Sequence, residues 1–284
     1  MAAEQSAPAA LLAACIGWAA LHGAAHLGFR SFLASRCHWY LQLRPEKQAE
    51  CVVNAVWLLL GLQLPVLYTA ASFELWESIG ERWHGTSILA EWALTLHIGQ
   101  SLYETAVYAR FGKGAEFFVH HAVVVINYGL SLYYGAMHFW AATVGLVEYS
   151  NPCLSVLQLI LISGKGRGSR LEMANGAALW VAFLLVRVIG LPLWLYCHVQ
   201  DVRGGAWTEA HDPTVRASAP PPAVVLWTMR LLAPLGVFMV WMISMLWFRK
   251  ITAGMLNAIR GDEEPGGSAS SENERAAGSA RKCR

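Results

Sequence analysis

The sequence is poor in charge and lacks the motifs of the common soluble enzymes. Asp, Glu, Lys and Arg make up only 14% of its 284 residues, whereas soluble domains carry roughly a quarter of such residues. We find no phosphate-binding loop, nucleophile elbow or dinucleotide fingerprint. The shortage of charge excludes a soluble domain, and we expect no resident cofactor and no nucleic-acid partner.

Cysteine and histidine patterns typical of metal sites are also missing. The six cysteines show no CxxC spacing, so we expect no zinc site. Cys37 and Cys51 flank a loop that we place in the cytosol, where thiols stay reduced. His22 and His26 have an i, i+4 spacing compatible with metal, but no third ligand is visible. We therefore interpret both histidines as packing residues and expect no metal.

The chain is rich in apolar segments that are long enough to cross a bilayer, which takes about 20 helical residues. Hydrophobic residues account for 56% of the sequence, and its mean hydropathy is +0.39. The sequence therefore predicts an all-α, multi-pass transmembrane helical bundle of about seven spans. Their approximate ranges are 8–29, 51–72, 87–109, 117–136, 138–162, 174–198 and 222–248.

Residues 117–162 leave two interpretations open, because one apolar block covers two of the expected spans. The length of the block favours two helices, with Gly129 or Gly135 at the turn between them. The alternative is a single span followed by a segment that lies at the membrane interface.

The distribution of positive charge predicts the orientation. If the N-terminus is lumenal, most of the 21 Lys and Arg residues fall in cytosolic connections. Since basic loops are retained on the cytoplasmic side, we expect a lumenal N-terminus and a cytosolic C-terminus. Lys282, third from the end, loosely resembles a dibasic retrieval signal, so the endoplasmic reticulum is the expected location.

Three regions follow from composition. Residues 1–45 contain the first transmembrane helix and a basic cytosolic loop, and residues 46–256 contain the other spans. Residues 257–284 are polar and nearly free of large apolar side chains. We expect that last region to be a disordered cytosolic tail.

Ionisable and polar residues inside the spans indicate an internal site, because such groups are costly next to lipid. His97, Gln100 and Glu104 stand at i, i+3 and i+7 and share one face of the third span. On the fourth span, His120 lies on the same face as Asn127 and His121 on the same face as Tyr128. Asn127, Tyr128 and the third-span residues become candidate members of one site.

A short connection, residues 110–116, joins the third and fourth spans, so we expect them to be antiparallel neighbours. Glu104 lies about 8 Å, and His120 and His121 about 5 Å, below the cytosolic surface at 1.5 Å per residue. We therefore expect the carboxylate to meet the histidines. It would fix the tautomer of an imidazole that acts as general base or nucleophile. The alternative is a polar clamp that only pins the two helices together.

A second candidate group is Glu148, in the segment EYSNP of the fifth span. We expect Asn151 and Pro152 to break the helix, which only a protein-lined or watered cavity tolerates. The alternative places Glu148 at a hairpin end in the interface. Arg187, in the sixth span, is positioned to neutralise Glu148 or Glu104, or to form a purely structural ion pair.

Five motifs in order resemble the TLC-domain family, named for TRAM, Lag1 and CLN8 proteins, which includes the ceramide synthases. The resemblance covers roughly residues 46–256. Glu104 and Arg187 fall at the family's acidic and arginine positions. The motifs are AECVVNAVWLLLGL, GQSLYETAVY, the paired histidines of FFVHHAVVV, VEYSNPCL and ANGAALWVAFLLVRVIGLP.

For the synthase branch, the resemblance implies acyl transfer from acyl-CoA to the amine of a sphingoid base. Acyl-CoA would be the co-substrate and membrane lipids the partners. The catalytic residues would be His120, His121 and Glu104. The remaining candidates would bind substrate: His97, Gln100, Asn127, Tyr128, Glu148 and Arg187.

The sequence departs from the synthases in one motif. No His-Asp-x-x-Asp element occurs between Ala122 and Pro152, where Glu148 is the one acid. In this respect the chain is nearer to the TLC branch without established synthase chemistry. The alternative function is therefore a non-enzymatic protein that regulates membrane lipid composition or acts as a lipid- or cargo-binding receptor. The sequence contains no feature that indicates an oligomeric state.

Overall fold

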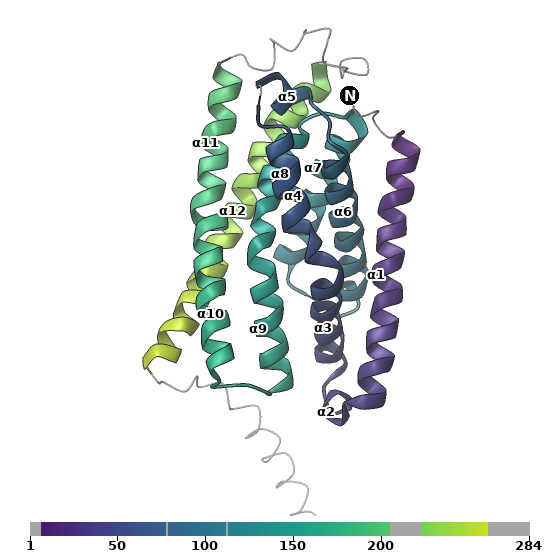
Figure 1. The fold of residues 1–284 in the computed structure, drawn as a ribbon, viewed down its shortest axis with the longest axis vertical. Coiled ribbons are helices and arrows are strands. Elements are labelled where there is room, and N and C mark those ends of the chain that lie inside the picture. Colours follow the sequence, from purple (N-terminus) through teal and green to yellow (C-terminus); the bar gives the residue numbers. More distant parts are fainter. Residues whose placement is uncertain (1–6, 78, 112, 205–222, 261–284) are drawn as a thin grey trace, which may run out of the picture.

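The computed structural model describes residues 7–77, 79–111, 113–204 and 223–260, and every regular element among them is a helix. The long helices form rods that stand side by side (Figure 1). Two short helices, α2 (His38–Leu41) and α5 (Ile79–His84), lie between rods. The rods are α1 (Pro8–Arg36), α3–η1–α4 (Pro45–Glu74), α6 (Ile88–Ala109), α7 (Ala115–Tyr134), α8–η2–α9 (His138–Ser163), α10–η3–α11 (Arg170–Arg203) and α12 (Ala223–Arg260).

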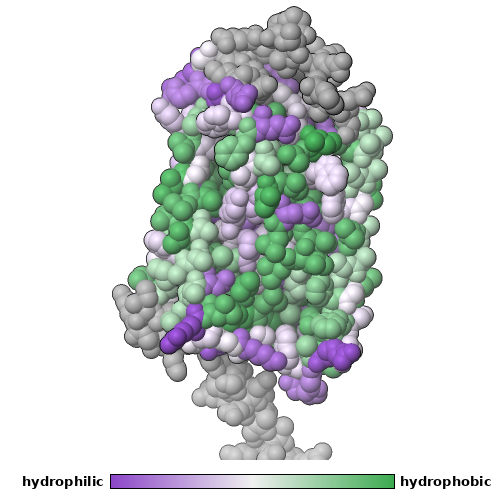
Figure 2. All heavy atoms as spheres, viewed as in Figure 1, coloured by the Kyte–Doolittle hydropathy of each residue, from purple (hydrophilic) through white to green (hydrophobic). Residues whose placement is uncertain are grey.

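Six of these rods are long and apolar enough to cross a membrane. On the face seen in Figure 2, apolar residues cover most of the middle of the bundle, and hydrophilic residues lie at both ends. Such an arrangement is what a bilayer requires of the surface that it contacts. The described residues therefore form an all-α, multi-pass membrane protein.

The seventh rod, α6, does not reach the hydropathy of the other six. It is also the most enclosed, since α1, α4, α7 and α8 pack around it and most of its side chains are buried. A helix covered by protein has no need to present an apolar face to lipid. Its lower hydropathy is therefore consistent with a central position, and the expectation of seven spans stays a prediction.

Residues 117–162 form two rods, as one of the two interpretations predicted. Gly135 ends α7 in the left-handed region, with φ 56°, and Met137 follows with φ 61°. The Met137 amide donates to the Trp83 carbonyl oxygen at 2.9 Å, which holds the turn against α5. Gly129 lies within α7, so Gly135 marks the turn.

Three rods change their helical pitch near the middle. α3 and α4 are joined by a π-helical turn, η1 (Trp57–Gly61), and α10 and α11 by another, η3 (Leu184–Ile189). Between α8 and α9 lies a 3₁₀ segment, η2 (Leu146–Ser150), directly before Asn151 and Pro152. The break expected at EYSNP is therefore a local tightening of the helix rather than an end. η2 packs against η3.

The rods have one strongly basic end, where α1 and α6 finish and where α9 is joined to α10. We call this the basic end. Among the described residues it carries Arg30, Arg36, Arg44, Lys47, Arg110, Lys113, Lys165, Arg167, Arg170, Arg249 and Lys250. The beginning of α1 lies at the opposite end (Figure 1). The cytosolic location of the basic end remains a prediction from the charge rule.

The last rod is longer than expected. α12 continues to Arg260, so the first four residues of the expected tail are helical. Residues 261–284, the rest of the expected disordered tail, lie outside the described residues.

Candidate functional site

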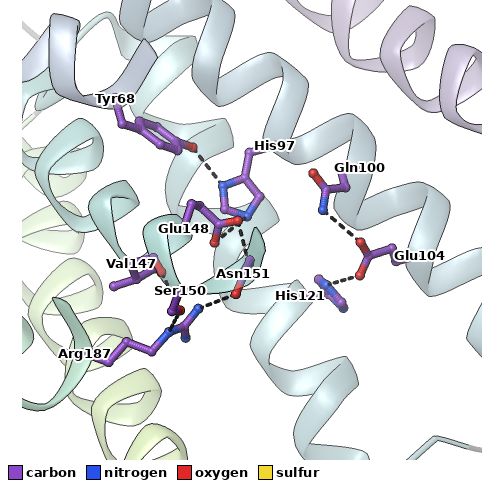
Figure 3. A network of polar contacts seen from close by, with 10 residues as sticks. All are labelled: Tyr68, His97, Gln100, Glu104, His121, Val147, Glu148, Ser150, Asn151 and Arg187. Atoms are coloured by element: carbon purple, nitrogen blue, oxygen red, sulfur yellow. Dashed lines mark hydrogen bonds and ion pairs between the residues drawn. The ribbon is translucent and has the colours of Figure 1, made fainter. Parts of the chain in front are cut away.

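The polar face of α6 forms as its spacing predicted. His97 and Gln100 are buried, with 6% and 5% of their surfaces exposed. The Gln100 Nε2 donates a 2.9 Å hydrogen bond to Glu104 Oε1. The three residues thus lie along one side of the helix, as Figure 3 shows, with the Glu104 carboxylate held by its own helix.

Glu104 meets the histidine pair through His121. The His121 Nε2 lies 3.5 Å from Glu104 Oε2, and the two side chains are only 10% and 13% exposed. The contact joins the end of α6 to the start of α7, which a short connection holds side by side. The expected meeting of carboxylate and imidazole is therefore confirmed for His121 (Figure 3).

His120 is oriented differently from His121. The centroids of the two imidazole rings are 5.4 Å apart, and the His120 ring lies 6.4 Å from that of Trp247 on α12. The Nδ1 atoms of both histidines are buried and have no hydrogen-bond partner within the described part of the chain. Neither Nδ1 atom is therefore held by another side chain or backbone group of the described residues.

A second polar group is built around His97 and Glu148. The Tyr68 hydroxyl lies 2.8 Å from His97 Nδ1, and His97 Nε2 lies 3.9 Å from Glu148 Oε1. Asn151 Nδ2 donates to Glu148 Oε2 at 2.8 Å. Glu148 is 3% exposed, so it lies inside the bundle and not at an interfacial hairpin end.

Arg187 reaches this group, but not by the ion pair that the sequence suggested. Its Nε donates to Ser150 Oγ at 2.9 Å, and its Nη2 donates to Asn151 Oδ1 at 3.1 Å. No carboxylate among the described residues lies within 4 Å of its guanidinium. Asn151 therefore stands between Arg187 and Glu148, so the two form no direct ion pair, although the guanidinium still interacts electrostatically with the Glu148 carboxylate.

The irregular helical segments η2 and η3 position the side chains of this second polar group. Ser150 and Glu148 belong to η2, and Arg187 belongs to η3. Irregular turns inside helices often occur at functional sites, because they turn a side chain or a backbone group toward a cavity. Sequence reasoning identified the η2 break but missed Tyr68 and Ser150 as members of the site. Tyr68 carries no motif that would have revealed it.

A narrow cavity of about 70 Å³ opens beside both polar groups. We call it the chamber. It follows α7 from His120 to Ser131, a length of about 16 Å at 1.5 Å per residue. Its polar lining consists of His97, His120, Asn127, Tyr128, Ser131 and Glu148. Its apolar lining includes Met137, Trp140, Val144, Val147, Trp194 and Val237.

Some of the predicted site residues line the chamber, and the others lie outside its lining. Of the expected binding residues, His97, Asn127, Tyr128 and Glu148 line it directly. The Asn127 amide also donates to the Val123 carbonyl oxygen of its own helix. The predicted residues that do not line the chamber are Gln100, Glu104, His121 and Arg187, each of which supports another polar residue of the site.

The interpretation of His22 and His26 as packing residues agrees with their contacts. His22 Nδ1 lies 2.7 Å from the Trp18 carbonyl oxygen, and His26 Nδ1 lies 2.8 Å from the Tyr103 hydroxyl. Within the described ranges, no group of three His, Cys, Asp or Glu side chains is arranged to hold a metal.

Comparison with known proteins identifies the family. The model of the TLC domain, the TRAM, LAG1 and CLN8 family, matches residues 47–253. No curated protein and no solved structure matches the chain. The matched region begins in α3, ends in α12, and contains every residue of the chamber and its two polar groups. The chain belongs to the TLC-domain family.

Proposed function

We propose that this protein is a lipid-metabolic acyltransferase, which transfers an acyl group from acyl-CoA to the amine of a long-chain, sphingoid-type base. The observation that carries the proposal is the contact of Glu104 with His121, directly beside a His120 that faces the chamber. A polar clamp would need only one imidazole and one carboxylate. The second imidazole, with its unpartnered nitrogen, is what a reaction requires and a clamp does not.

The two histidines would have different roles. Glu104 orients His121, as carboxylates commonly orient imidazoles in active sites. His120 lines the chamber and is the group that touches substrate. In direct transfer, the amine nitrogen attacks the thioester carbon and the C–S bond breaks. His120 takes the proton from the amine and passes it to the departing thiolate, which yields an amide and CoA.

The same residues also suit a two-step route. His120 would attack the thioester carbon and release the CoA thiolate, and the amine would then displace the imidazole from the acyl group. The freed imidazole would take the proton that the amine loses and pass it to the thiolate. The two routes differ in one observable. Only the second produces an acyl group on His120 when acyl-CoA is supplied without an amine, which intact-protein and peptide mass spectrometry would detect.

The lining of the chamber, with its polar and apolar side chains, supports a substrate that has one polar end and an apolar part. Because the chamber has a volume of only about 70 Å³, a lipid chain would have to displace the side chains that line it. His97, His120 and Glu148 line the chamber together with Asn127, Tyr128 and Ser131 along α7, and apolar side chains form most of the remaining wall. Ligand pockets are commonly built in this way, with a few polar groups that fix orientation. The apolar lining would hold a lipid chain while the reacting atoms lie beside His120.

The test is release of CoA by the purified protein, given palmitoyl-CoA and a panel of long-chain amines. The protein should release CoA in an amine-dependent manner and form the corresponding amide. Replacing both histidines, as His120→Ala with His121→Ala, should lower turnover by about a hundredfold or more, the usual contribution of acid–base catalysis. His38→Ala, at an exposed histidine of the basic end, is the matched control. Equal turnover in the double variant and the control would contradict the proposal.

A second function is favoured by the placement of Glu148. This acid is held by Asn151 and faces His97, so it stands with the second polar group and not with the histidine pair. The catalytic centre would then contain a single acidic residue, Glu104. A non-enzymatic lipid- or cargo-binding protein that shifts membrane lipid composition would fit this arrangement. In cells that lack the protein, rescue of the lipid profile by the double-histidine variant would favour this second function.

We also propose residence in the endoplasmic reticulum, with the basic segment that contains Lys282 as the candidate retrieval signal. A Lys282→Ala variant, tagged at the N-terminus and imaged in cells, should redistribute to later compartments. Unchanged retention of that variant would remove this proposal without affecting the acyltransferase.

A further inference from the structure

A second and larger cavity lies on the other side of α6, and no residue lines both cavities. It has a volume of about 640 Å³ and is formed by α1, α6, α2 and the start of α3. We call it the groove. Ligand pockets commonly have volumes of about 300–1,000 Å³, so the groove is large enough for a substantial part of a lipid.

The walls of the groove are graded from charged to apolar. Arg30 on α1 and Arg110 after α6 line it at the basic end, and both residues are exposed. Among the described residues, no carboxylate forms an ion pair with either. From Arg30 the groove follows α1 back to Ala19, which is about 16 Å at 1.5 Å per residue.

A polar pair lies partway along the groove. His26 and Tyr103 both line it, and His26 Nδ1 lies 2.8 Å from the Tyr103 hydroxyl. His26 is one helical turn above Arg30 on the same face of α1, about 6 Å along the axis. Beyond the pair, the walls are apolar. Leu27 and Leu102 remain 64% and 41% exposed, so the groove is open toward the surrounding lipid.

We propose that the groove binds an anionic phospholipid of the leaflet at the basic end. The phosphate would lie between Arg30 and Arg110, since basic pockets between transmembrane helices bind anionic headgroups. The ester groups would lie at the depth of His26 and Tyr103, and one acyl chain would follow α1 toward Ala19. The free cations and the graded polarity favour a phospholipid over an uncharged lipid.

The site is independent of the proposed acyltransferase chemistry. Its α6 residues Leu102 and Ala106 lie on the side of that helix opposite to His97 and Glu104, by the helical spacing of 100° per residue. Binding can therefore be measured on the full-length purified protein without any assay of turnover.

Native mass spectrometry of the detergent-purified protein provides the test. The probes are a phosphatidylglycerol and a phosphatidylcholine with the same acyl chains, together with glycerol 3-phosphate as a headgroup without chains. The phosphatidylglycerol should bind more tightly than the phosphatidylcholine. Each of Arg30→Gln and Arg110→Gln should weaken its binding about fivefold, from roughly 1 kcal/mol for each basic residue near the headgroup. Arg36→Gln, which removes a charge of α1 outside the groove, should leave binding unchanged.

A pair of glycine variants tests the location. A Cβ atom at Gly23 or at Gly17 would meet no other atom within 4 Å, so both positions tolerate a side chain. Only Gly23 lines the groove. Gly23→Leu should therefore reduce phospholipid binding, while Gly17→Leu should not.

Four results would overturn the proposal. The first is equal binding of the two phospholipids, and the second is an equal loss of binding in Arg36→Gln and the groove arginine variants. The third is an equal effect of Gly17→Leu and Gly23→Leu. Displacement of the phospholipid by glycerol 3-phosphate at similar concentration would show a phosphate site without a lipid site, and would also contradict it.

Discussion

At the scale of single residues, the chamber depends on side chains that hold other side chains. His121 faces Glu104, and Glu104 accepts from Gln100. Glu148 is held by Asn151, which in turn accepts from Arg187. Polar groups buried in this way stay in place because each would lose a hydrogen bond on leaving. Removal of one of these side chains should therefore change the positions of the side chains that it holds.

Replacing Glu104 by Gln tests the role of the carboxylate. The variant keeps the size of the side chain and a hydrogen-bonding partner for Gln100, but it removes the charge that faces His121. We expect amine-dependent release of CoA to fall by about a hundredfold or more, while the protein remains folded by circular dichroism. Glu116→Gln, at an exposed position in the first turn of α7, is the control. Full activity of Glu104→Gln would show that the carboxylate has no part in the reaction.

Arg187 gives a prediction about stability. Arg187→Met removes the donors to Ser150 and Asn151 and leaves their oxygens without these hydrogen bonds. Each hydrogen bond to a charged group contributes about 1.5–3 kcal/mol, so thermal unfolding in detergent should occur at a clearly lower temperature. Arg170→Met, at an exposed arginine at the start of α10, should change little. Equal melting temperatures for the two variants would contradict this role of Arg187.

At the scale of helices, close packing around α6 positions the site. A Cβ atom at Gly99 would lie 2.5 Å from Trp18 Cβ and 2.8 Å from the Cys15 carbonyl oxygen. α1 and α6 therefore approach each other so closely that only glycine fits between them, an arrangement common between transmembrane helices. The opposite face of α6 carries His97, which lines the chamber.

Gly99→Val should push α1 away from α6. We expect a loss of about 1–3 kcal/mol in stability, the usual cost of overpacking, and reduced activity because α6 carries His97 and Glu104. Gly129→Val is the matched control, since a Cβ atom at Gly129 would meet nothing within 4 Å. Thermal unfolding of both variants in the same detergent measures the difference. A Gly99→Val protein as stable as Gly129→Val would refute the close contact.

Periodicity and chain connectivity explain which parts of the site could be predicted. The i, i+3, i+7 spacing of α6 and the short connection to α7 were sufficient to bring Glu104 to the histidine pair, although not to select His121 as its partner. Tyr68 and Ser150 could not be predicted, because their roles depend on how distant rods pack and not on local spacing. The link from Arg187 to Glu148 through Asn151 required the pitch changes of η2 and η3, which the hydrophobic pattern does not encode.

At the scale of the whole molecule, apolar length predicted each long helix and its order along the chain. The described rods begin and end within several residues of the expected spans, except where α1 and α12 continue beyond the apolar segment. Membrane thickness limits the apolar stretch but not the helix itself. This is why the end of α12 could not be read from hydropathy.

The orientation in the membrane can be tested with single cysteines in a background without the native ones. Lys165→Cys lies at the basic end, and Arg203→Cys lies near the opposite end of α11; both positions are exposed. In intact cells, an impermeant thiol reagent should label neither. After selective permeabilisation of the plasma membrane, it should label Lys165→Cys alone. Labelling of Arg203→Cys alone after permeabilisation of the plasma membrane would show that the orientation is opposite to the predicted one.

The central claim is that His120, His121 and Glu104 come together beside an internal chamber that receives a lipid chain. An experimental density map of the full-length protein, purified with palmitoyl-CoA in a lipid environment, tests it most directly. We predict His121 Nε2 within hydrogen-bond reach of Glu104 and continuous chain-like density along α7 from His120 toward Ser131. Histidine rings that point out to the lipid, or acyl density only outside the bundle, would contradict the claim.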